Sequence, residues 1–212
     1  MLLAFDTATH AVTVALHTGT PDGEVLAEST VVDALRHGEL LAPGIRQVLA
    51  DAGCTPRDLT GIAVGVGPGP FTGLRVGIVT ARTMGAALGI PVHGVCTLDV
   101  IAAAVRDRDD GFRVATDARR KEVYWAAYDA TGKRSTVPSV DRPEDVPYDG
   151  PVAGRGARLY SESFPQPIEP ENPDAADLAT LIASDAVEAL APEPLYLRRP
   201  DAAAPGQRKR VL

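Results

Sequence analysis

Two aspartates are the residues best suited by type and position to do chemistry. Asp6 and Asp117 each end a short apolar run. In some ATPases and sugar kinases, an acid after the first strand of each domain helps to hold a hydrated magnesium ion on the phosphates of the nucleotide. The stretch that begins at Asp6, DTATH, offers the hydroxyl of Thr7 but lacks the glycine that lets a phosphate-binding hairpin approach closely. We therefore favour a structural role, in which both carboxylates accept hydrogen bonds from the backbone of their own turns.

A glycine-rich loop, GVGPGPFTG, begins at Gly65, after an apolar run, and leads into a helical pattern. A P-loop needs a lysine, and none occurs between Gly65 and Gly89. A dinucleotide-binding loop has the pattern G-x-G-x-x-G. Gly67 and Gly69 fit its first two glycines, but the third position is occupied by Thr72. A looser cradle of backbone N–H groups, with Thr72 as the helix cap, remains open for ATP or ADP.

Small residues recur every four positions beyond the loop, at Gly73, Gly77, Ala81, Gly85 and Gly89. Each glycine costs a helix roughly 0.8–1 kcal/mol relative to alanine, so close approach to another backbone must compensate. The stripe packs either against the chain's own sheet or against another subunit. For the subunit alternative, we expect Gly77→Leu to abolish pairing and to leave the fold largely intact.

Metal ligands and nucleophiles lack the required spacing. Two histidines one helical turn apart can bind a metal, but the residue four positions after His37 is Leu41. His10, His17 and His93 are scattered. Neither an H-E-x-x-H nor a G-x-S-x-G motif occurs. We therefore predict no metal site and no catalytic residues.

Composition limits the partners and the compartment. The formal net charge is −7, which argues against RNA binding by this chain alone, although the end of the chain, QRKRVL, is basic. The two cysteines indicate a reducing compartment. We recognise neither a leader nor a membrane span, and we expect a cytoplasmic protein.

Apolar runs and turn residues predict alternating strands and helices. In the first half, strands are expected at 2–6, 11–19, 21–32, 61–66 and 91–97. Helices are expected at 37–53 and 98–107, and a third helix is expected to begin at Thr72 and to run for about sixteen residues. In the second half, a strand is expected at 151–154 and a helix at 173–190, with Asp174 as its N-cap. The start of the second half aligns with the N-terminus: Asp117 aligns with Asp6 and Val123 with Val12, an offset of 111 residues. This repeat predicts a duplicated domain, and chance alignment of two hairpins is the alternative.

Four motifs, in this order, resemble the TsaB (YeaZ) family: AFDTAT, GVGPGPFTGLRVGI, DARRKEVYWAAY and PLYLR. The resemblance implies an α/β, actin-like (ASKHA, ribonuclease H-like) fold of two related domains, each with a mixed sheet flanked by helices. We assign 1–105 to the N-terminal domain, 106–192 to a smaller C-terminal domain and 193–212 to a connection and basic tail. Pro70 departs from the family, in which serine is frequent at this position.

The resemblance also implies a function. The chain would be a non-catalytic partner of TsaD, the subunit that transfers the threonylcarbamoyl group to the tRNA adenosine next to the anticodon. A TsaE-type ATPase would join the larger assembly, the chain would form a homodimer when alone, and tRNA would be contacted only indirectly. The alternatives are an ATPase or kinase acting alone and, with less support, a glycoprotease-type peptidase.

Two sets of site residues follow from this interpretation. No cofactor is required, but ATP or ADP at a subunit interface would involve Asp6, Thr7, Gly67, Gly69 and Thr72. The subunit contact is predicted at His37, Leu40, Leu41, Ile45, Pro70, Phe71, Gly73, Leu74, Arg75, Gly77, Ile78, Ala81 and Arg82. In that contact the large apolar residues would form the centre, and Arg75 and Arg82 the polar rim.

Overall fold

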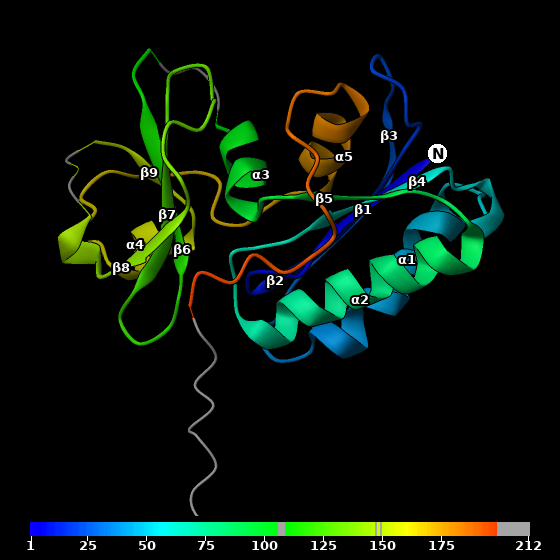
Figure 1. Ribbon diagram of the computed structural model, residues 1–212, viewed down its shortest axis with the longest axis horizontal. Helices are drawn as coiled ribbons and strands as arrows, with labels where there is room; N and C mark the ends of the chain where they lie inside the picture. The colour runs from blue at the N-terminus through cyan, green and yellow to red at the C-terminus, as the bar shows by residue number, and fades with distance from the viewer. Residues whose placement is uncertain (106–108, 147, 149, 199–212) are drawn as a thin grey trace, which may run out of the picture.

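The computed structural model describes residues 1–105, 109–146, 148 and 150–198, and in that part of the chain the strands form two five-stranded sheets (Figure 1). The first sheet has the order β3 (Val25–Val32), β2 (Ala11–His17), β1 (Leu2–Asp6), β4 (Gly61–Gly65) and β5 (Val92–Val95). The second has the order β10 (Pro167–Ile168), β9 (Val152–Ala153), β6 (Phe112–Asp117), β7 (Val123–Tyr128) and β8 (Ser139–Asp141). The helices are α1 (His37–Asp51), α2 (Phe71–Leu88), α3 (Thr97–Ala103), α4 (Arg155–Leu159) and α5 (Ala175–Ala183). Most of the predicted tail, residues 199–212, lies outside the described residues.

The second sheet repeats the topology of the first. β6, β7 and β8 form an antiparallel meander as β1, β2 and β3 do. β9 and β10 then add parallel strands beyond β6, as β4 and β5 do beyond β1. Asp6 pairs with Thr13 at the end of one hairpin, and Asp117 pairs with Val123 at the end of the other. The predicted duplication is therefore confirmed, and with it the fold of two related α/β domains.

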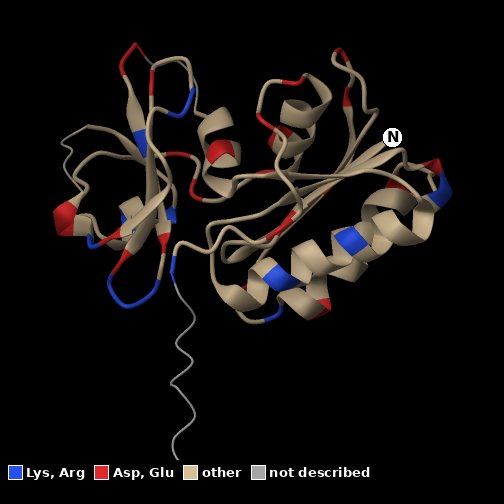
Figure 2. Ribbon diagram, in the orientation of Figure 1, with Lys and Arg blue, Asp and Glu red and all other residues tan. Residues whose placement is uncertain are grey.

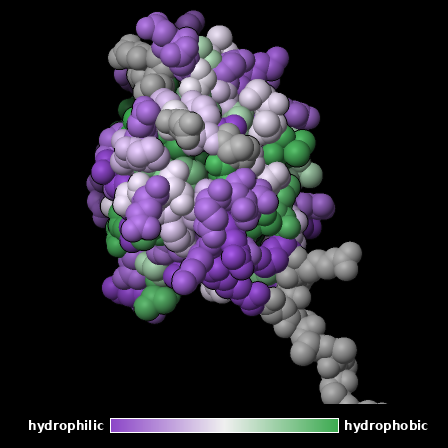
Figure 3. All heavy atoms as spheres, turned by 90° about the vertical axis from the view of Figure 1, so that its left-hand side faces the viewer, coloured by the Kyte–Doolittle hydropathy of each residue, from purple (hydrophilic) through white to green (hydrophobic). Residues whose placement is uncertain are grey.

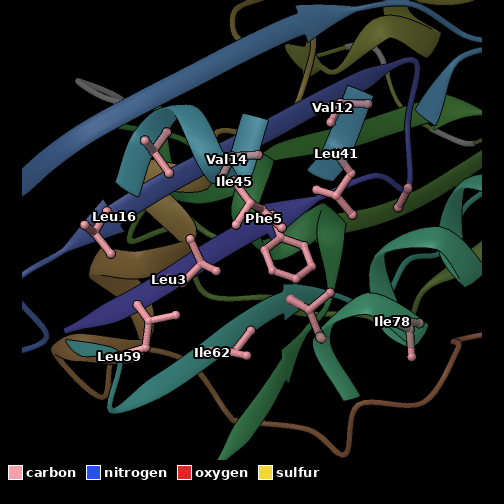
Figure 4. Packing of buried hydrophobic residues seen from close by; sticks show 14 of the residues in the cluster. Leu3, Phe5, Val12, Val14, Leu16, Leu41, Ile45, Leu59, Ile62 and Ile78 are labelled. Atoms are coloured by element: carbon pink, nitrogen blue, oxygen red, sulfur yellow. The ribbon is translucent and has the colours of Figure 1, made fainter. Parts of the chain in front are cut away.

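Helices cover both faces of the first sheet, which explains why β1 and β4 are apolar without alternation. Successive side chains of a strand point to opposite faces, so Leu3 and Phe5 face α1 and α2, whereas Leu2 and Ala4 face α5. Figure 4 shows the larger of these two clusters, which also contains Val12, Val14, Leu16, Leu41, Ile45, Leu59, Ile62 and Ile78. The β1–β2 hairpin is thus held rigidly from both sides.

The second sheet is also packed on both faces. Leu98 and Ile101 of α3 contact Phe112 and Val114 on one face. On the other face, Ala157 of α4 joins a separate buried cluster. Because α3 also packs against α5, it connects the two halves of the molecule.

The proposed domain ranges do not separate the two sheets with their helices. The boundary after residue 105 lies between α3 and β6. However, α5 lies within the range 106–192 and packs against the first sheet, where Leu178 joins Leu2 and Ala4. The chain therefore returns to the first domain after it completes the second sheet.

Several predicted helix ends are wrong. α1 ends at Asp51 instead of residue 53, and α3 ends at Ala103 instead of residue 107. Two other ends have a clear local cause. α2 begins at Phe71, because Pro70 is held in an extended conformation (φ −60°, ψ 137°) and serves as the N-cap in place of Thr72. α5 ends at Ala183 instead of residue 190, because Asp185 adopts a left-handed φ of 54° that a helix cannot contain. The N-cap of α5 is confirmed, since the side chain of Asp174 accepts from the N–H of Ala176. Among the described residues, no helix combines the length and the apolar character needed to cross a membrane.

Candidate functional site

Asp6 ends β1 in the core of the first domain and is fully buried. Its Oδ1 accepts a hydrogen bond from the N–H of Ala8 at 2.6 Å, and its Oδ2 accepts one from the hydroxyl of Thr97 at 2.7 Å. Asp117 repeats the first contact, because its Oδ1 accepts from the N–H of Arg119 at 2.8 Å. These bonds confirm the structural role predicted for both acids, each of which fixes the turn after its strand.

The environment of Asp6 makes stability depend on pH. Burial raises the pKa of Asp6 above its ordinary value of 3.8, although its hydrogen bonds to Ala8 and Thr97 oppose this shift. The unfolded chain therefore releases this proton at a lower pH than the folded chain, so the free energy of unfolding falls as pH rises from 3.8 through the folded pKa. We expect Asp6→Asn to remove this component, which is at most about 1.4 kcal/mol per pH unit. Urea unfolding of the unmodified chain and the Asp6→Asn variant between about pH 4 and 7 measures this component. If the free energy of unfolding changed with pH equally steeply in both proteins, the prediction would be wrong.

The glycine loop and the first turns of α2 wrap around the residues that follow β1. A Cβ on Gly69 would lie 2.1 Å from the carbonyl oxygen of Ala8, and one on Gly73 would lie 2.3 Å from that of Thr7. The hydroxyl of Thr7 donates to the carbonyl oxygen of Gly73 at 2.7 Å. The glycines therefore permit close approach inside one domain, which is the first of the two alternatives that their spacing left open.

The residues predicted to contact a nucleotide do not share one open surface. Asp6 and Thr7 are buried, with their side chains hydrogen-bonded in the core. The N–H of Gly67 is hydrogen-bonded inside the protein, and the turn after β1 closes off Gly69. Of the five, Thr72 alone is exposed. It lines a hollow of about 270 Å³ with Thr9, His10, Pro70 and Arg119.

Most residues predicted for the subunit contact belong instead to the chain's own core. The buried members are His37, Leu41, Ile45, Gly73, Leu74, Gly77, Ile78 and Ala81. Leu41, Ile45, Leu74, Ile78 and Ala81 belong to the cluster that packs against β1, β2 and β4. Of the eight buried residues, Ile78 also lines a hollow beside α2, and His37 and Gly73 line another near Thr72. Gly77→Leu, expected from the sequence to leave the fold largely intact, should instead disturb the packing, because a Cβ there would lie 2.5 Å from the hydroxyl oxygen of Thr7.

His37 has a defined structural role at the start of α1. Its Nε2 lies 2.7 Å from the carbonyl oxygen of Thr9. Because a carbonyl oxygen only accepts, Nε2 donates this hydrogen bond. Leu41, one turn later, is buried in the core. His37 thus ties α1 to the turn between β1 and β2.

The opposite side of α2 is exposed and combines apolar and cationic side chains. Val79 is 60% exposed, and Arg75 and Arg82 lie one turn before and after it. Together with the segment near the end of the described chain, they border a shallow hollow of about 400 Å³. We call this surface the α2 outer face, and it consists of Arg75, Val79, Arg82, Thr83, Pro194 and Tyr196.

Val79, Thr83, Pro194 and Tyr196 are the members of this surface that were not predicted. The ring of Tyr196 packs on Phe71 with a centroid distance of 4.6 Å, and its hydroxyl accepts from Nε of Arg75 at 3.2 Å. The PLYLR motif signals Tyr196 in the sequence, but nothing local shows that it lies beside α2. Val79 lies between Gly77 and Ala81 in the sequence, and it is found only by identifying which side of the helix is buried.

Comparisons with known proteins agree with this architecture. The family model described as TsaD: tRNA N6-adenosine threonylcarbamoyltransferase matches residues 24–191. An uncharacterized protein of Mycobacterium tuberculosis is 46% identical over 204 residues, which are 95% of this chain and 93% of that protein. The tRNA threonylcarbamoyladenosine biosynthesis protein TsaB of Escherichia coli is 38% identical over 129 residues, which are 60% of this chain and 54% of that protein. The structure of YeaZ from Pseudomonas aeruginosa superimposes with a TM-score of 0.75 at 34% identity, and covers 92% of this chain and 99% of that one.

The duplicated sheets and the acid that ends the first strand of each define a two-domain α/β protein with an actin-like fold. Within this class, the matches to YeaZ and TsaB have 34% and 38% sequence identity. The chain belongs to the TsaB (YeaZ) family.

Proposed function

We propose that this chain is a non-catalytic subunit that pairs with a TsaD-type subunit and activates it to modify the tRNA adenosine next to the anticodon. The name of the Escherichia coli relative places that protein in threonylcarbamoyladenosine biosynthesis. The family model that matches this chain carries the name of the transferase itself. A role in the same pathway is therefore the interpretation best supported by relatedness.

The observation that carries the pairing proposal is the α2 outer face. An apolar side chain that is 60% exposed, Val79, lies between two arginines on a helix whose other side is anchored by glycine contacts. Protein interfaces combine an apolar centre with a polar rim in this way. We therefore replace the buried members of the predicted contact by Val79 and Tyr196, and we retain Leu40, Pro70, Phe71, Arg75 and Arg82.

The non-catalytic assignment is supported by what the chain's own groups already bind. Asp6 and Thr7 are engaged in internal hydrogen bonds, and Nε2 of His37 donates to Thr9. These groups are therefore committed to holding the turn after β1, and the transfer chemistry would belong to the partner. ATP or ADP, if bound, would lie at the subunit interface near Thr72.

The remaining partners follow from the same proposal. Alone, the chain would use the α2 outer face to form a homodimer in the cytoplasm. With the TsaD-type subunit present, the same face would exchange partners, and a TsaE-type ATPase would join the pair. The tRNA would be held mainly by the catalytic subunit, because this chain carries a net charge of −7.

Sedimentation velocity of the chain, alone and mixed with the TsaD-type protein of the same organism, with and without ATP, tests the proposal. We expect a mixed complex to replace the self-associated form. A chain that ignores the TsaD-type protein and hydrolyses ATP by itself would overturn the proposal and favour the ATPase alternative.

A further inference from the structure

The turn between β6 and β7 has an unusual backbone and an unusual composition. Arg119, Arg120 and Lys121 are consecutive, and all three have left-handed φ values, of 61°, 57° and 61°. Side chains with a Cβ rarely adopt this region, and each such residue costs roughly 1 kcal/mol. Three in succession require strong support from the surrounding structure.

That support comes from both ends of the turn and from the distant PLYLR motif. The N–H of Ala118 donates to the carbonyl oxygen of Glu122 at 3.0 Å, and the N–H of Glu122 donates to that of Arg119 at 3.0 Å. Nη1 of Arg198 donates to the carbonyl oxygen of Ala118 at 3.1 Å, and Arg198 also forms an ion pair with Glu122. Arg198 therefore holds the turn in place and is a positioning residue.

The rigid turn presents its three cations to solvent. All three residues are exposed. The side chain of Arg119 is 57% exposed, although its Nε lies 3.8 Å from Oδ2 of Asp117. The turn appears blue at one end of the second sheet in Figure 2. Figure 3 shows that hydrophilic side chains gather on the lower half of the adjoining face.

A hollow of about 490 Å³ lies beside the turn and continues its polar character. Arg120 and Lys121 line it together with Arg142, which is also exposed. Two acids, Glu144 and Glu162, lie on the same rim. With Asp117 and Glu122, which form ion pairs with Arg119 and Arg198, four acids stand against five cations here, so this end of the second sheet is slightly positive on a chain whose net charge is −7.

We propose that the turn Arg119–Lys121 is a phosphate-contacting element for the backbone of an RNA held by the assembled complex. The proposal rests on the proposed function, because an acidic chain alone does not retain RNA. It replaces the expectation that this chain contacts tRNA only indirectly. Closely spaced, fixed cations suit a phosphate backbone, and their rigidity lowers the entropy lost on contact. The turn would add to the contacts of the catalytic subunit without reading the base sequence.

The test compares tRNA binding by the complex of the full chain with its TsaD-type subunit, using an unmodified tRNA transcript over a series of salt concentrations. The variant is the triple replacement Arg119→Gln, Arg120→Gln and Lys121→Gln, which removes three charges and keeps unbranched side chains. We expect weaker binding, with the slope of log affinity against log salt reduced by about 2. The control is Lys133→Gln, an exposed lysine beyond the opposite end of β7.

Unchanged affinity and salt slope in the triple variant would overturn the proposal. Loss of RNA binding because the variant no longer assembles, as seen by size-exclusion chromatography, would also overturn it and would make the turn a protein contact. Arg198→Gln, which keeps all three cations, should weaken RNA binding less than the triple variant does. Failure of the unmodified chain to assemble would contradict the proposed function itself, and with it the premise of this inference.

Discussion

Replacing Gly69 by alanine should lower the free energy of unfolding by about 3 kcal/mol. The added Cβ would lie 2.1 Å from the carbonyl oxygen of Ala8 and 2.9 Å from its carbonyl carbon, and both are backbone atoms. The neighbouring turn cannot move away easily, because Asp6 holds the N–H of Ala8 from inside the core. Thermal and urea unfolding measure the loss, which corresponds to a fall in Tm of roughly 6–12 °C for a chain of this size.

Gly38→Ala is the matched control for this prediction. Gly38 lies in the first turn of α1, and a Cβ there would have only Val76 nearby, at an ordinary contact distance of 4.0 Å. Replacing Gly38 by alanine should leave the free energy of unfolding unchanged or raise it by up to about 1 kcal/mol. If both alanine variants unfolded alike, the close approach of the loop would not be the reason for Gly69.

Replacing Val79 by glutamate should weaken pairing with the TsaD-type subunit by about 100-fold, a loss in the range of an interface hot spot. The glutamate would bury a charge at the apolar centre of the α2 outer face when the partner binds. Because Val79 is 60% exposed in the chain alone, stability should change by less than about 0.5 kcal/mol. Sedimentation velocity or calorimetric titration with the partner measures the affinity.

Val137→Glu provides the same chemical change at another exposed site. Val137 is 78% exposed and lies between β7 and β8 in the second domain, away from α2. It should leave both pairing and stability unaffected. Normal pairing by the Val79 variant would remove the α2 outer face from the proposed contact.

These two predictions separate the internal contacts of α2 and the loop before it from the exposed side of the helix. The side with Gly73 and Gly77 fixes α2 against the turn after β1, so substitutions there act through folding. The side with Val79 is free, so substitutions there act through association. A loss of pairing in a glycine variant would therefore not identify a subunit contact, whereas a loss in the Val79 variant at unchanged stability would.

The sequence by itself determined the fold class, the duplication and the family. These depend on patterns that stay local: an acid at the end of an apolar strand, the same arrangement 111 residues later, and a few specific motifs. The structural role of Asp6 and Asp117 was predictable for the same reason, because each carboxylate binds the N–H two residues further along the chain.

Only the tertiary structure decided what the glycine stripe approaches and which side of α2 is free. A spacing of four residues shows that one side of a helix carries small side chains, but it does not show what fills the space. Here Thr7, which lies 66 residues from Gly73 in the sequence, fills it. Likewise, Tyr196 reaches Arg75 across 121 residues and completes the exposed face. Contacts over such separations arise from the folding of the whole chain, and no local pattern encodes them.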